Sequence, residues 1–189
     1  MSVVMKSFKL LVLHHLKSFT SPLLVPLQFA YRANWSVDDA INLALHFILQ
    51  QLDSPGTYAR ILFVDFNSAF NTILPALLQD KLVQLNVPDS TCRWITDFVV
   101  MDRRQRVWLG KNVLDTWTIS TGSPQGCVLS PLPFSLYTNC CTFSHDSVKL
   151  VKFVGDTTLI GLISDSDESA YRREVDWLVS WCSSNNMEP

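Results

Sequence analysis

Two short apolar blocks, each ending in an acidic residue, constrain this chain more than any other feature. They are Phe63-Val64-Asp65 and Phe153-Val154-Gly155-Asp156. In each block, a run of apolar residues typical of a β-strand leads to the carboxylate. Two carboxylates on adjacent strands can hold Mg²⁺, which prefers oxygen ligands and often takes only one or two carboxylates from the protein. The ordinary alternatives are a solvated acid at a strand end for Asp65 and a Gly-Asp hairpin turn for Asp156.

Composition favours a globular fold. The 189 residues are 48% hydrophobic and 17% charged, with a net charge of −2. This balance excludes a disordered chain and gives no global electrostatic argument for nucleic acid. Arg103, Arg104 and Arg106 form a local basic cluster, a pattern that is more often a solvated face than a phosphate site. The six tryptophans are interpreted as core and surface packing.

The cysteines and the lengths of the apolar stretches indicate where in the cell the protein would be found. Five cysteines, an odd number without C-x-x-C spacing, indicate reduced thiols and an intracellular protein of the cytoplasm or nucleus. No apolar stretch reaches the roughly 18 to 20 residues that a spanning helix requires, so we expect no membrane partner.

The periodicity of apolar residues predicts an α+β fold with a small, mainly antiparallel sheet. Ser36 and Asp39 form a capping box that opens a helix to residue 52. A two-residue turn is predicted at Gly155-Asp156. The other predicted elements are helices over residues 4–18, 75–85, 89–100, 129–139 and 167–182, a strand over 58–66, and hairpins pairing 107–109 with 116–120 and 148–154 with 157–162.

A loop with two glycines, Gly122-Ser123-Pro124-Gln125-Gly126, precedes the predicted helix at 129–139. Glycines let a backbone approach a ligand closely, and a helix N-terminus favours anions. The loop is therefore a mild nucleotide or phosphate signal, and an ordinary strand-to-helix connection is the alternative.

Taken together, these blocks resemble the palm of a reverse transcriptase of the kind encoded by non-LTR (LINE-type) retrotransposons. The segments 65–73, 122–131 and 153–156 occur in the family's order at family-like separations. Gln28-Phe29-Ala30-Tyr31-Arg32 resembles the fingers motif that precedes them. The resemblance implies one partial reverse transcriptase domain over 1–189, with fingers-like helices over about 1–57 and the palm over about 58–189.

The resemblance also implies a role for each matched residue. Asp65 and Asp156 would be the catalytic, Mg²⁺-binding acids, and Phe70 would be the steric gate beneath the incoming sugar. The implied partners are an RNA template, a DNA primer and a dNTP. The remaining site residues are Phe66, Gln125, Gly126 and Arg32 for the nucleotide, and Arg103, Arg104 and Arg106 for nucleic acid.

At the second block the chain departs from the family, which has two adjacent acids there. Gly155 replaces the first of them. Losing one fixed transition-state group typically costs about 10²–10³ in rate, so we expect an impaired polymerase. The sequence stops at Pro189, before the family's downstream lysine and thumb, so we expect a palm with partial fingers and no thumb. The alternatives are a non-catalytic module that binds nucleic acid or protein, and a relic without function.

Overall fold

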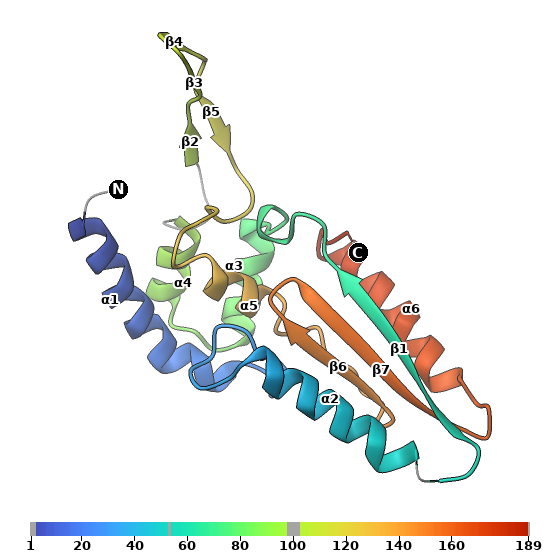
Figure 1. Ribbon diagram of the computed structural model, residues 1–189. Coiled ribbons are helices and arrows are strands. Elements are labelled where there is room, and N and C mark those ends of the chain that lie inside the picture. The colour runs from blue at the N-terminus through green and yellow to red at the C-terminus, as the bar shows by residue number, and fades with distance from the viewer. Residues whose placement is uncertain (1–2, 53, 98–102, 189) are drawn as a thin grey trace. The chain divides into compact units, whose positions relative to one another are not determined.

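The computed structural model describes residues 3–52, 54–97 and 103–188 (Figure 1). These residues form two compact units, each made from two separate segments of the chain. The first unit comprises Met1–Leu23 and Ser68–Tyr137, and the second comprises Leu24–Asn67 and Thr138–Pro189. Both units mix helices with antiparallel strands, which confirms the predicted α+β class.

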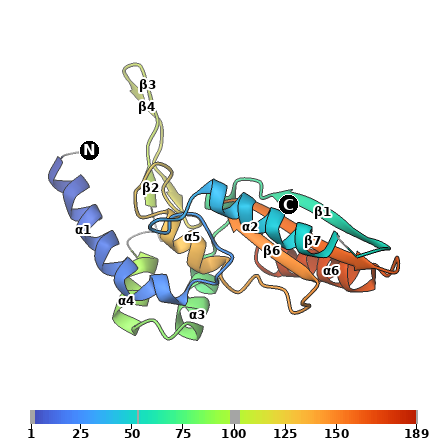
Figure 2. The ribbon, with the colours of Figure 1, turned by 60° about the horizontal axis from the view of Figure 1, so that its bottom comes forward.

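A three-stranded antiparallel sheet with the order β1-β7-β6 forms the centre of the second unit. Its strands are β1 (Thr57–Asp65), β6 (Val148–Phe153) and β7 (Asp156–Ser164). Helices α2 (Val37–Leu52) and α6 (Ser169–Ser184) contact the sheet and cover opposite faces of it (Figure 2). The central strand β7 is consequently buried on both faces, as its apolar sequence requires.

Helix α2 begins with the predicted capping box. The Ser36 backbone N–H donates to Asp39 Oδ2 at 2.7 Å, and the Asp39 N–H donates to Ser36 Oγ at 3.2 Å. These bonds satisfy two backbone donors that a helix start leaves without intrahelical partners. The buried side of α2 packs through Ala40 onto Val151 and Ile160 of the sheet.

The β6–β7 hairpin turns one residue earlier than predicted. Phe153 pairs with Asp156, so the two loop residues are Val154 and Gly155 rather than Gly155 and Asp156. Glycine is commonest at the first loop position of one tight hairpin turn, which is why the pattern favoured the wrong pair. Here Val154 takes that position with a φ of 59°, an unfavourable conformation for a β-branched residue. Asp156 is therefore the first residue of β7.

Four helices build the body of the first unit: α1 (Val3–Thr20), α3 (Pro75–Gln84), α4 (Asp89–Ile95) and α5 (Pro131–Tyr137). The unit also contains two short 3-10 turns, Ser21–Leu23 after α1 and Ala69–Asn71 before α3. The end predicted near residue 100 for the helix at α4 lies outside the described residues. None of the helices in the described parts of the chain is both long and apolar enough to cross a membrane. The core side chains of this unit include Ile73, Leu78, Leu82, Ile95 and Phe134.

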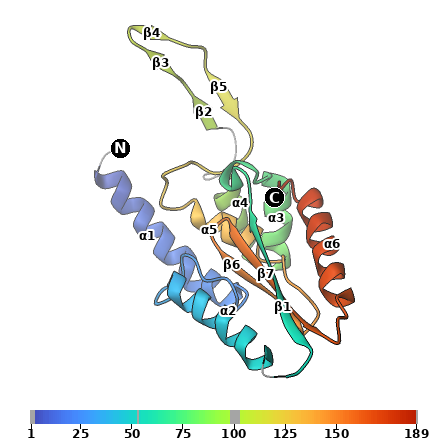
Figure 3. The ribbon, with the colours of Figure 1, turned by 45° about the vertical axis from the view of Figure 1, so that its right-hand side comes forward.

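The first unit contains a hairpin in this region, but the predicted pairing of residues 107–109 with 116–120 is wrong, because residues 108–109 pair with 112–113 and residues 117–119 pair with 103–105. It consists of two ladders, β2 (Arg103–Gln105) with β5 (Trp117–Ile119), and β3 (Trp108–Leu109) with β4 (Asn112–Val113). We call the segment from Arg103 to Ile119 the arm. It extends away from the helices of its own unit (Figure 3).

Candidate functional site

The two predicted metal ligands face each other in the sheet of the second unit. Asp65, the last residue of β1, is the direct partner of Asp156, the first residue of β7. Directly opposed residues in antiparallel strands have Cα atoms about 4.5–5.5 Å apart. Both acids are exposed, and like charges in this position destabilise a strand pair. A divalent cation between the carboxylates would remove that repulsion.

These two carboxylates stand without a third acidic, cysteine or histidine ligand. Within residues 3–52, 54–97 and 103–188, no group of three or more His, Cys, Asp or Glu side chains is arranged to hold a metal ion. Gly155, next to Asp156, supplies no side-chain ligand. The arrangement fits Mg²⁺ bound by one or two carboxylates and completed by water or phosphate oxygens, rather than a closed protein cage.

Backbone strain lies beside the acid pair. Val154 precedes Gly155 in the hairpin loop and has a positive φ of 59°. A conformation of this kind costs on the order of 1–3 kcal/mol and persists only where the surrounding structure imposes it. The β6–β7 ladder continues to the Phe153–Asp156 pair, so Val154 and Gly155 alone must complete the turn.

An apolar groove of about 450 Å³ runs between α2 and the sheet, and Asp156 lies in its wall. Among the described residues that line it, Asp156 alone carries a charge. Phe63, two residues before Asp65, is 77% exposed at this groove. The attraction between Asp156 and a cation is screened less beside such an apolar wall than in open water.

Two further predicted nucleotide residues of the second unit have local structural contacts. The Phe66 side chain is buried. Arg32 Nη1 donates to the carbonyl oxygens of Val25 at 3.3 Å and Gln28 at 3.2 Å. The Arg32 guanidinium also lies 4.8 Å from the centre of the Trp35 ring, within cation–π range. Arg32 therefore stabilises the segment around residues 25–28, and the nucleotide contacts of both residues stay predictions.

In the first unit, the glycine loop packs tightly against the predicted steric gate. The Gly122 N–H donates to the Ile73 carbonyl and the Ser123 N–H to the Phe70 carbonyl, both at 2.7 Å. Gly122 has a φ of +68°, and a Cβ at this position would lie 2.6 Å from Asn71 Cα. Only glycine fits such a conformation and such an approach. The loop thereby fixes the backbone of Phe70.

Arg103 supports the same loop from the base of the arm. Its Nη2 donates to the carbonyl oxygens of Thr121 at 2.7 Å and Gly122 at 2.9 Å. Burial lowers the pKa of the Arg103 guanidinium. Arg104 and Arg106 are exposed instead. The three arginines predicted to contact nucleic acid thus fall into one that holds the loop and two that are open to a ligand.

A polar pocket of about 650 Å³ joins the arm base to the glycine loop within the first unit. It brings Gln125, a predicted nucleotide residue, next to Arg103 and Arg104. Ser123 Oγ and Arg103 Nε are buried there without hydrogen-bond partners in the described structure. Guanidinium, amide and hydroxyl donors suit phosphate oxygens. Gly126 follows in the exposed part of the loop with a φ of +70°.

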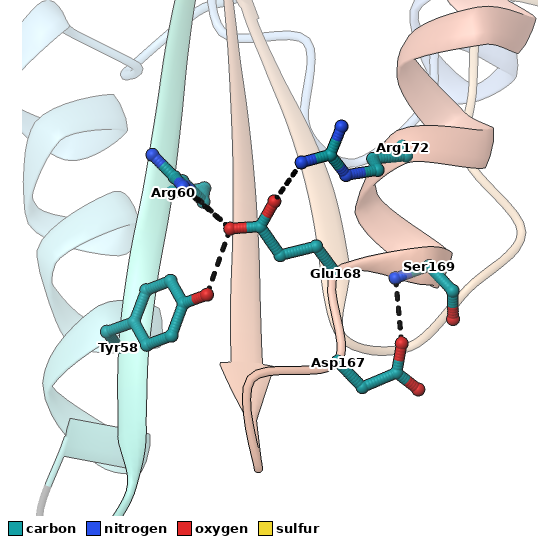
Figure 4. Close-up of polar contacts among 6 residues, drawn as sticks. All are labelled: Tyr58, Arg60, Asp167, Glu168, Ser169 and Arg172. Carbon is teal, nitrogen blue, oxygen red and sulfur yellow. Dashed lines mark hydrogen bonds and ion pairs between the residues drawn. The ribbon is translucent and has the colours of Figure 1, made fainter.

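A polar cluster that the sequence did not reveal joins β1 to the start of α6 (Figure 4). Glu168 Oε1 accepts hydrogen bonds from Tyr58 Oη at 2.9 Å and Arg60 Nε at 2.8 Å, and Oε2 pairs with Arg172 at 2.8 Å. Arg60 first, then Tyr58 and Arg172, lower the pKa of Glu168 to about 2. The sequence could have indicated only the Glu168–Arg172 ion pair, whose partners are four residues apart. Tyr58 and Arg60 lie too far from Glu168 in the sequence to be connected with it.

The predicted site residues therefore divide between the units. The acid pair with Phe66 and Arg32 belongs to the second unit, and Phe70, Gln125, Gly126 and the arginine cluster belong to the first. The second unit thus carries acidic oxygens, and the first carries donors that suit phosphate oxygens.

Comparison with known protein families places the chain in one of them. Residues 1–188 match the family model described as reverse transcriptase (RNA-dependent DNA polymerase). The chain therefore belongs to the reverse transcriptase family. No curated protein matches it.

Solved structures of telomerase share the fold. Apo telomerase from Candida tropicalis, truncated from its C-terminal domain, has a TM-score of 0.58 at 13% sequence identity. The match covers 92% of this chain and 36% of the telomerase chain. A second apo structure from Candida tropicalis has a TM-score of 0.56 at 13% identity, with 96% and 35% covered. Telomerase from Candida albicans, in complex with a fragment of telomeric RNA, has a TM-score of 0.52 at 14% identity, with 90% and 30% covered. The chain thus spans about a third of these telomerases, and the likeness establishes the fold.

Proposed function

We propose that this chain is the palm, with part of the fingers, of a non-LTR (LINE-type) retrotransposon reverse transcriptase whose DNA synthesis is impaired. The observation that carries the proposal is the pairing of Asp65 with Asp156 at the ends of β1 and β7. The segment Gly122-Ser123-Pro124-Gln125-Gly126 supports the LINE-type assignment by its resemblance to that class.

In the proposed reaction, a primer 3′-hydroxyl attacks the α-phosphate of a dNTP chosen by an RNA template, the bond from the α-phosphorus to the bridging oxygen breaks, and pyrophosphate and the hydroxyl proton are released. Mg²⁺ at the acid pair supplies activation of the attacking oxygen and charge neutralisation. Asp65 and Asp156 would hold that ion, and Phe70 would exclude a sugar with a 2′-hydroxyl. Gln125 and Gly126 contact the nucleotide and template. Most of the catalytic effect of such a site is positioning and electrostatic stabilisation.

Impairment follows from Gly155. Two carboxylates hold Mg²⁺ less firmly than three, and the loss of one fixed ligand costs about 10²–10³ in rate or more. The five free cysteines support the intracellular setting expected for such an enzyme.

The test is RNA-templated primer extension with Mg²⁺ and with Mn²⁺. We expect no measurable incorporation by the unaltered chain, and recovery of incorporation in Gly155→Asp, in a version extended through a thumb. Gly155→Asn is the matched control, because it adds nearly the same volume without the charge. Asp65→Ala in the Gly155→Asp background should abolish the recovered activity.

Two results would contradict the proposal. The first is robust incorporation by the unaltered chain that disappears on Asp65→Ala, which would show that Gly155 does not impair it. The second is a silent Gly155→Asp variant that still binds primer–template, which would place the acid pair outside any polymerase site.

A non-catalytic nucleic-acid-binding module is the second candidate. The polar pocket with Arg103 and Arg104 favours it, because this pocket needs no metal to bind phosphate. Association with a primer–template should then weaken steeply with salt, and less steeply when Arg104 is replaced. Binding that is insensitive to both would exclude this candidate.

A further inference from the structure

Helix α1 of the first unit exposes apolar side chains over its first turns. Every residue from Val3 to Phe8 is exposed, and Val4 is 79% exposed. These turns project away from the other helices of their unit (Figure 2). Leu11, one turn beyond Phe8, is 71% exposed. Large apolar side chains gathered in this way usually mark a binding surface.

The apolar and the basic residues of these turns occupy different sides of the helix. Val4, Phe8 and Leu11 are spaced four and three residues apart, which places them in one line along α1, called here the apolar row. Lys6 and Lys9 are three residues apart and form the lysine row. At about 100° per residue, the lysine row lies on the side of the helix opposite to the apolar row. This separation makes the first turns of α1 amphipathic.

The charged residues of α1 are all basic. The helix carries Lys6, Lys9 and Lys17 and no acidic residue, while the whole chain has a net charge of −2. Helix α2 is the opposite case, because its exposed apolar residues accompany Asp38 and Asp39 and no lysine or arginine. Lysines on the polar side of an exposed apolar row are typical of helices that lie on an anionic membrane. The charge of α1 therefore complements an anionic apolar surface, and the charge of α2 does not.

The apolar row of α1 continues into a cavity between α1 and α4, within the same unit. This cavity has a volume of about 450 Å³, and Leu11, Leu16 and Trp94 are among the residues that line it. A cavity of this size with an apolar lining accepts an apolar ligand. Helix α4 adds no net charge beside it, because Asp89 is paired with Arg93. An acyl chain can therefore extend from the exposed row into the cavity.

We propose that α1 lies in the surface of an anionic phospholipid bilayer, with the apolar row among the acyl chains and the lysine row beside the headgroups. Lysine side chains are long and flexible, so their ammonium groups can reach the headgroups while their stems cover apolar surface. A bilayer also surrounds the exposed side chains that flank the apolar row, Val3 and Leu10. A partner helix would cover only a narrower stripe.

A helix that lies in the membrane interface needs no spanning length. The expectation of no membrane partner rested on spanning helices alone, and the proposed contact replaces it. Membrane binding by α1 goes beyond the proposed function, because it uses neither the acid pair nor the polar pocket beside the glycine loop.

The experiment measures flotation of the full chain with lipid vesicles in a density gradient. Vesicles of phosphatidylcholine alone are compared with vesicles made of equal parts of phosphatidylcholine and phosphatidylserine. We expect the chain to float with the anionic vesicles and to stay largely unbound with the neutral ones. Raising the salt from about 0.1 M to 1 M should release part of the bound chain, because it shortens the screening length from about 10 Å to 3 Å.

Substitution within the apolar row tests the immersion of these side chains. Val4→Gln and Leu11→Gln should each lower the partition coefficient onto anionic vesicles about tenfold, because each removes an apolar side chain from the acyl region. Leu11→Phe keeps an apolar group there and should retain most of the binding. Leu49→Gln is the matched control: Leu49 is 61% exposed on α2, and its replacement should leave the partition coefficient unchanged.

Substitution within the lysine row tests the headgroup contacts. Lys6→Gln and Lys9→Gln should each weaken binding to anionic vesicles about fivefold, the effect of one lysine near an anionic surface. Arg173→Gln removes a positive charge from an exposed position on α6 and should leave the binding unchanged. Thermal melts of all variants confirm that the fold is retained.

Several outcomes would overturn the proposal. They are no flotation with anionic vesicles, equal flotation with neutral and anionic vesicles, and flotation of Leu11→Gln equal to that of the unaltered chain. An equal loss of binding in Leu49→Gln would also overturn it, because the binding would then not depend on α1. Self-association in sedimentation that Leu11→Gln abolishes, with flotation unchanged, would make α1 a protein interface instead.

The membrane and polymerase proposals can fail separately. Gly155→Asp should float with anionic vesicles as the unaltered chain does, because Gly155 belongs to the other unit. If Gly155→Asp extends primers while the unaltered chain does not float, the membrane proposal fails and the polymerase proposal stands. The reverse pair of results would remove the polymerase proposal and keep the membrane contact of α1.

Discussion

Two antiparallel hairpins in the described part of the chain look alike in sequence and differ in what covers them. The β6–β7 hairpin lies in a three-stranded sheet between α2 and α6, and Leu159 on β7 is fully buried. The arm has nearly the same strand–turn–strand pattern with Gly110 at its tip, yet its strands are open to solvent. The strand signal is local, whereas burial depends on the helices that the rest of the chain supplies. The β6–β7 hairpin can therefore hold the Asp156 carboxylate in a fixed position. The side chains of the arm stay open to solvent and to a ligand.

The largest expected difference between the hairpins is in their contribution to stability. Leu159→Ala should lower the free energy of unfolding by about 2–5 kcal/mol, because it leaves a cavity in a fully buried site. Leu109→Ala, at an exposed position of the arm, should change it by less than about 0.5 kcal/mol. Urea titration of both variants measures this. Equal losses would mean that the arm is buried in solution and that the comparison is wrong.

The second test compares two glycines with the same backbone conformation. Gly122 and Gly110 have φ values of +68° and +62°, but a Cβ at Gly110 would meet nothing within 4 Å. Gly110→Ala should therefore cost only the left-handed backbone strain, about 1–2 kcal/mol. Gly122→Ala should cost about 1–3 kcal/mol more, because the methyl group clashes with the Phe70–Asn71 backbone. Similar costs in thermal melts would show that the loop yields easily and does not fix Phe70.

A smaller effect is expected at the acid pair of the covered hairpin. Asp65→Asn should raise the metal-free stability by about 0.2–1 kcal/mol, since it removes repulsion between directly opposed charges. Added Mg²⁺ should raise the melting temperature of the unaltered chain more than that of the variant. Asp176→Asn, an exposed acid on α6, is the control and should respond to metal as the unaltered chain does. Destabilisation by Asp65→Asn without metal would contradict the facing arrangement.

The smallest effect concerns the salt bridges that join β1 to α6, because exposed ion pairs contribute little. The pKa of Glu168 is lowered to about 2 in the folded chain from an ordinary value of 4.5. A carboxyl with a lowered folded pKa stabilises the fold above pH 4.5, and this contribution is lost as the pH falls from 4.5 towards 2. Glu168→Gln should therefore melt lower than the unaltered chain at pH 6, with the difference disappearing near pH 2. A constant difference across this range would exclude the ion pairs as its cause.

Local signals in the sequence predicted much of the covered hairpin and its surroundings. The capping box at Ser36 and Asp39 and the strand ending at Asp65 are present because they depend on neighbouring residues. The turn lies one residue earlier than predicted, since the register of β7 against the whole of β1 and β6 outweighs the glycine preference at the first turn position. That register decides whether the acids can share an ion.

Features made by residues far apart in sequence could not be predicted in the same way. Arg103 was grouped with Arg104 and Arg106 because the three are adjacent, yet its contacts with the Thr121 and Gly122 carbonyls depend on the return of the chain after the arm. The Glu168 cluster depends on the packing of α6 beside β1. Trp108 and Trp117 are exposed because no helix among the described residues of their unit covers them, which no local pattern encodes.

The position of β1 at the edge of its sheet has a consequence for the behaviour of concentrated protein. In the described structure β1 bonds to β7 alone, so its outer row of amide and carbonyl groups is open to strand addition. The exposed Phe63 side chain makes this edge prone to association with another strand. The charges of Arg60 and Asp65 on the same strand oppose that association, as charged residues on the edge strands of natural sheets do. We therefore expect Asp65 to favour solubility, a role separate from the cation binding proposed for it. Its replacement by asparagine would stabilise the monomer and at the same time favour the first step towards fibrils.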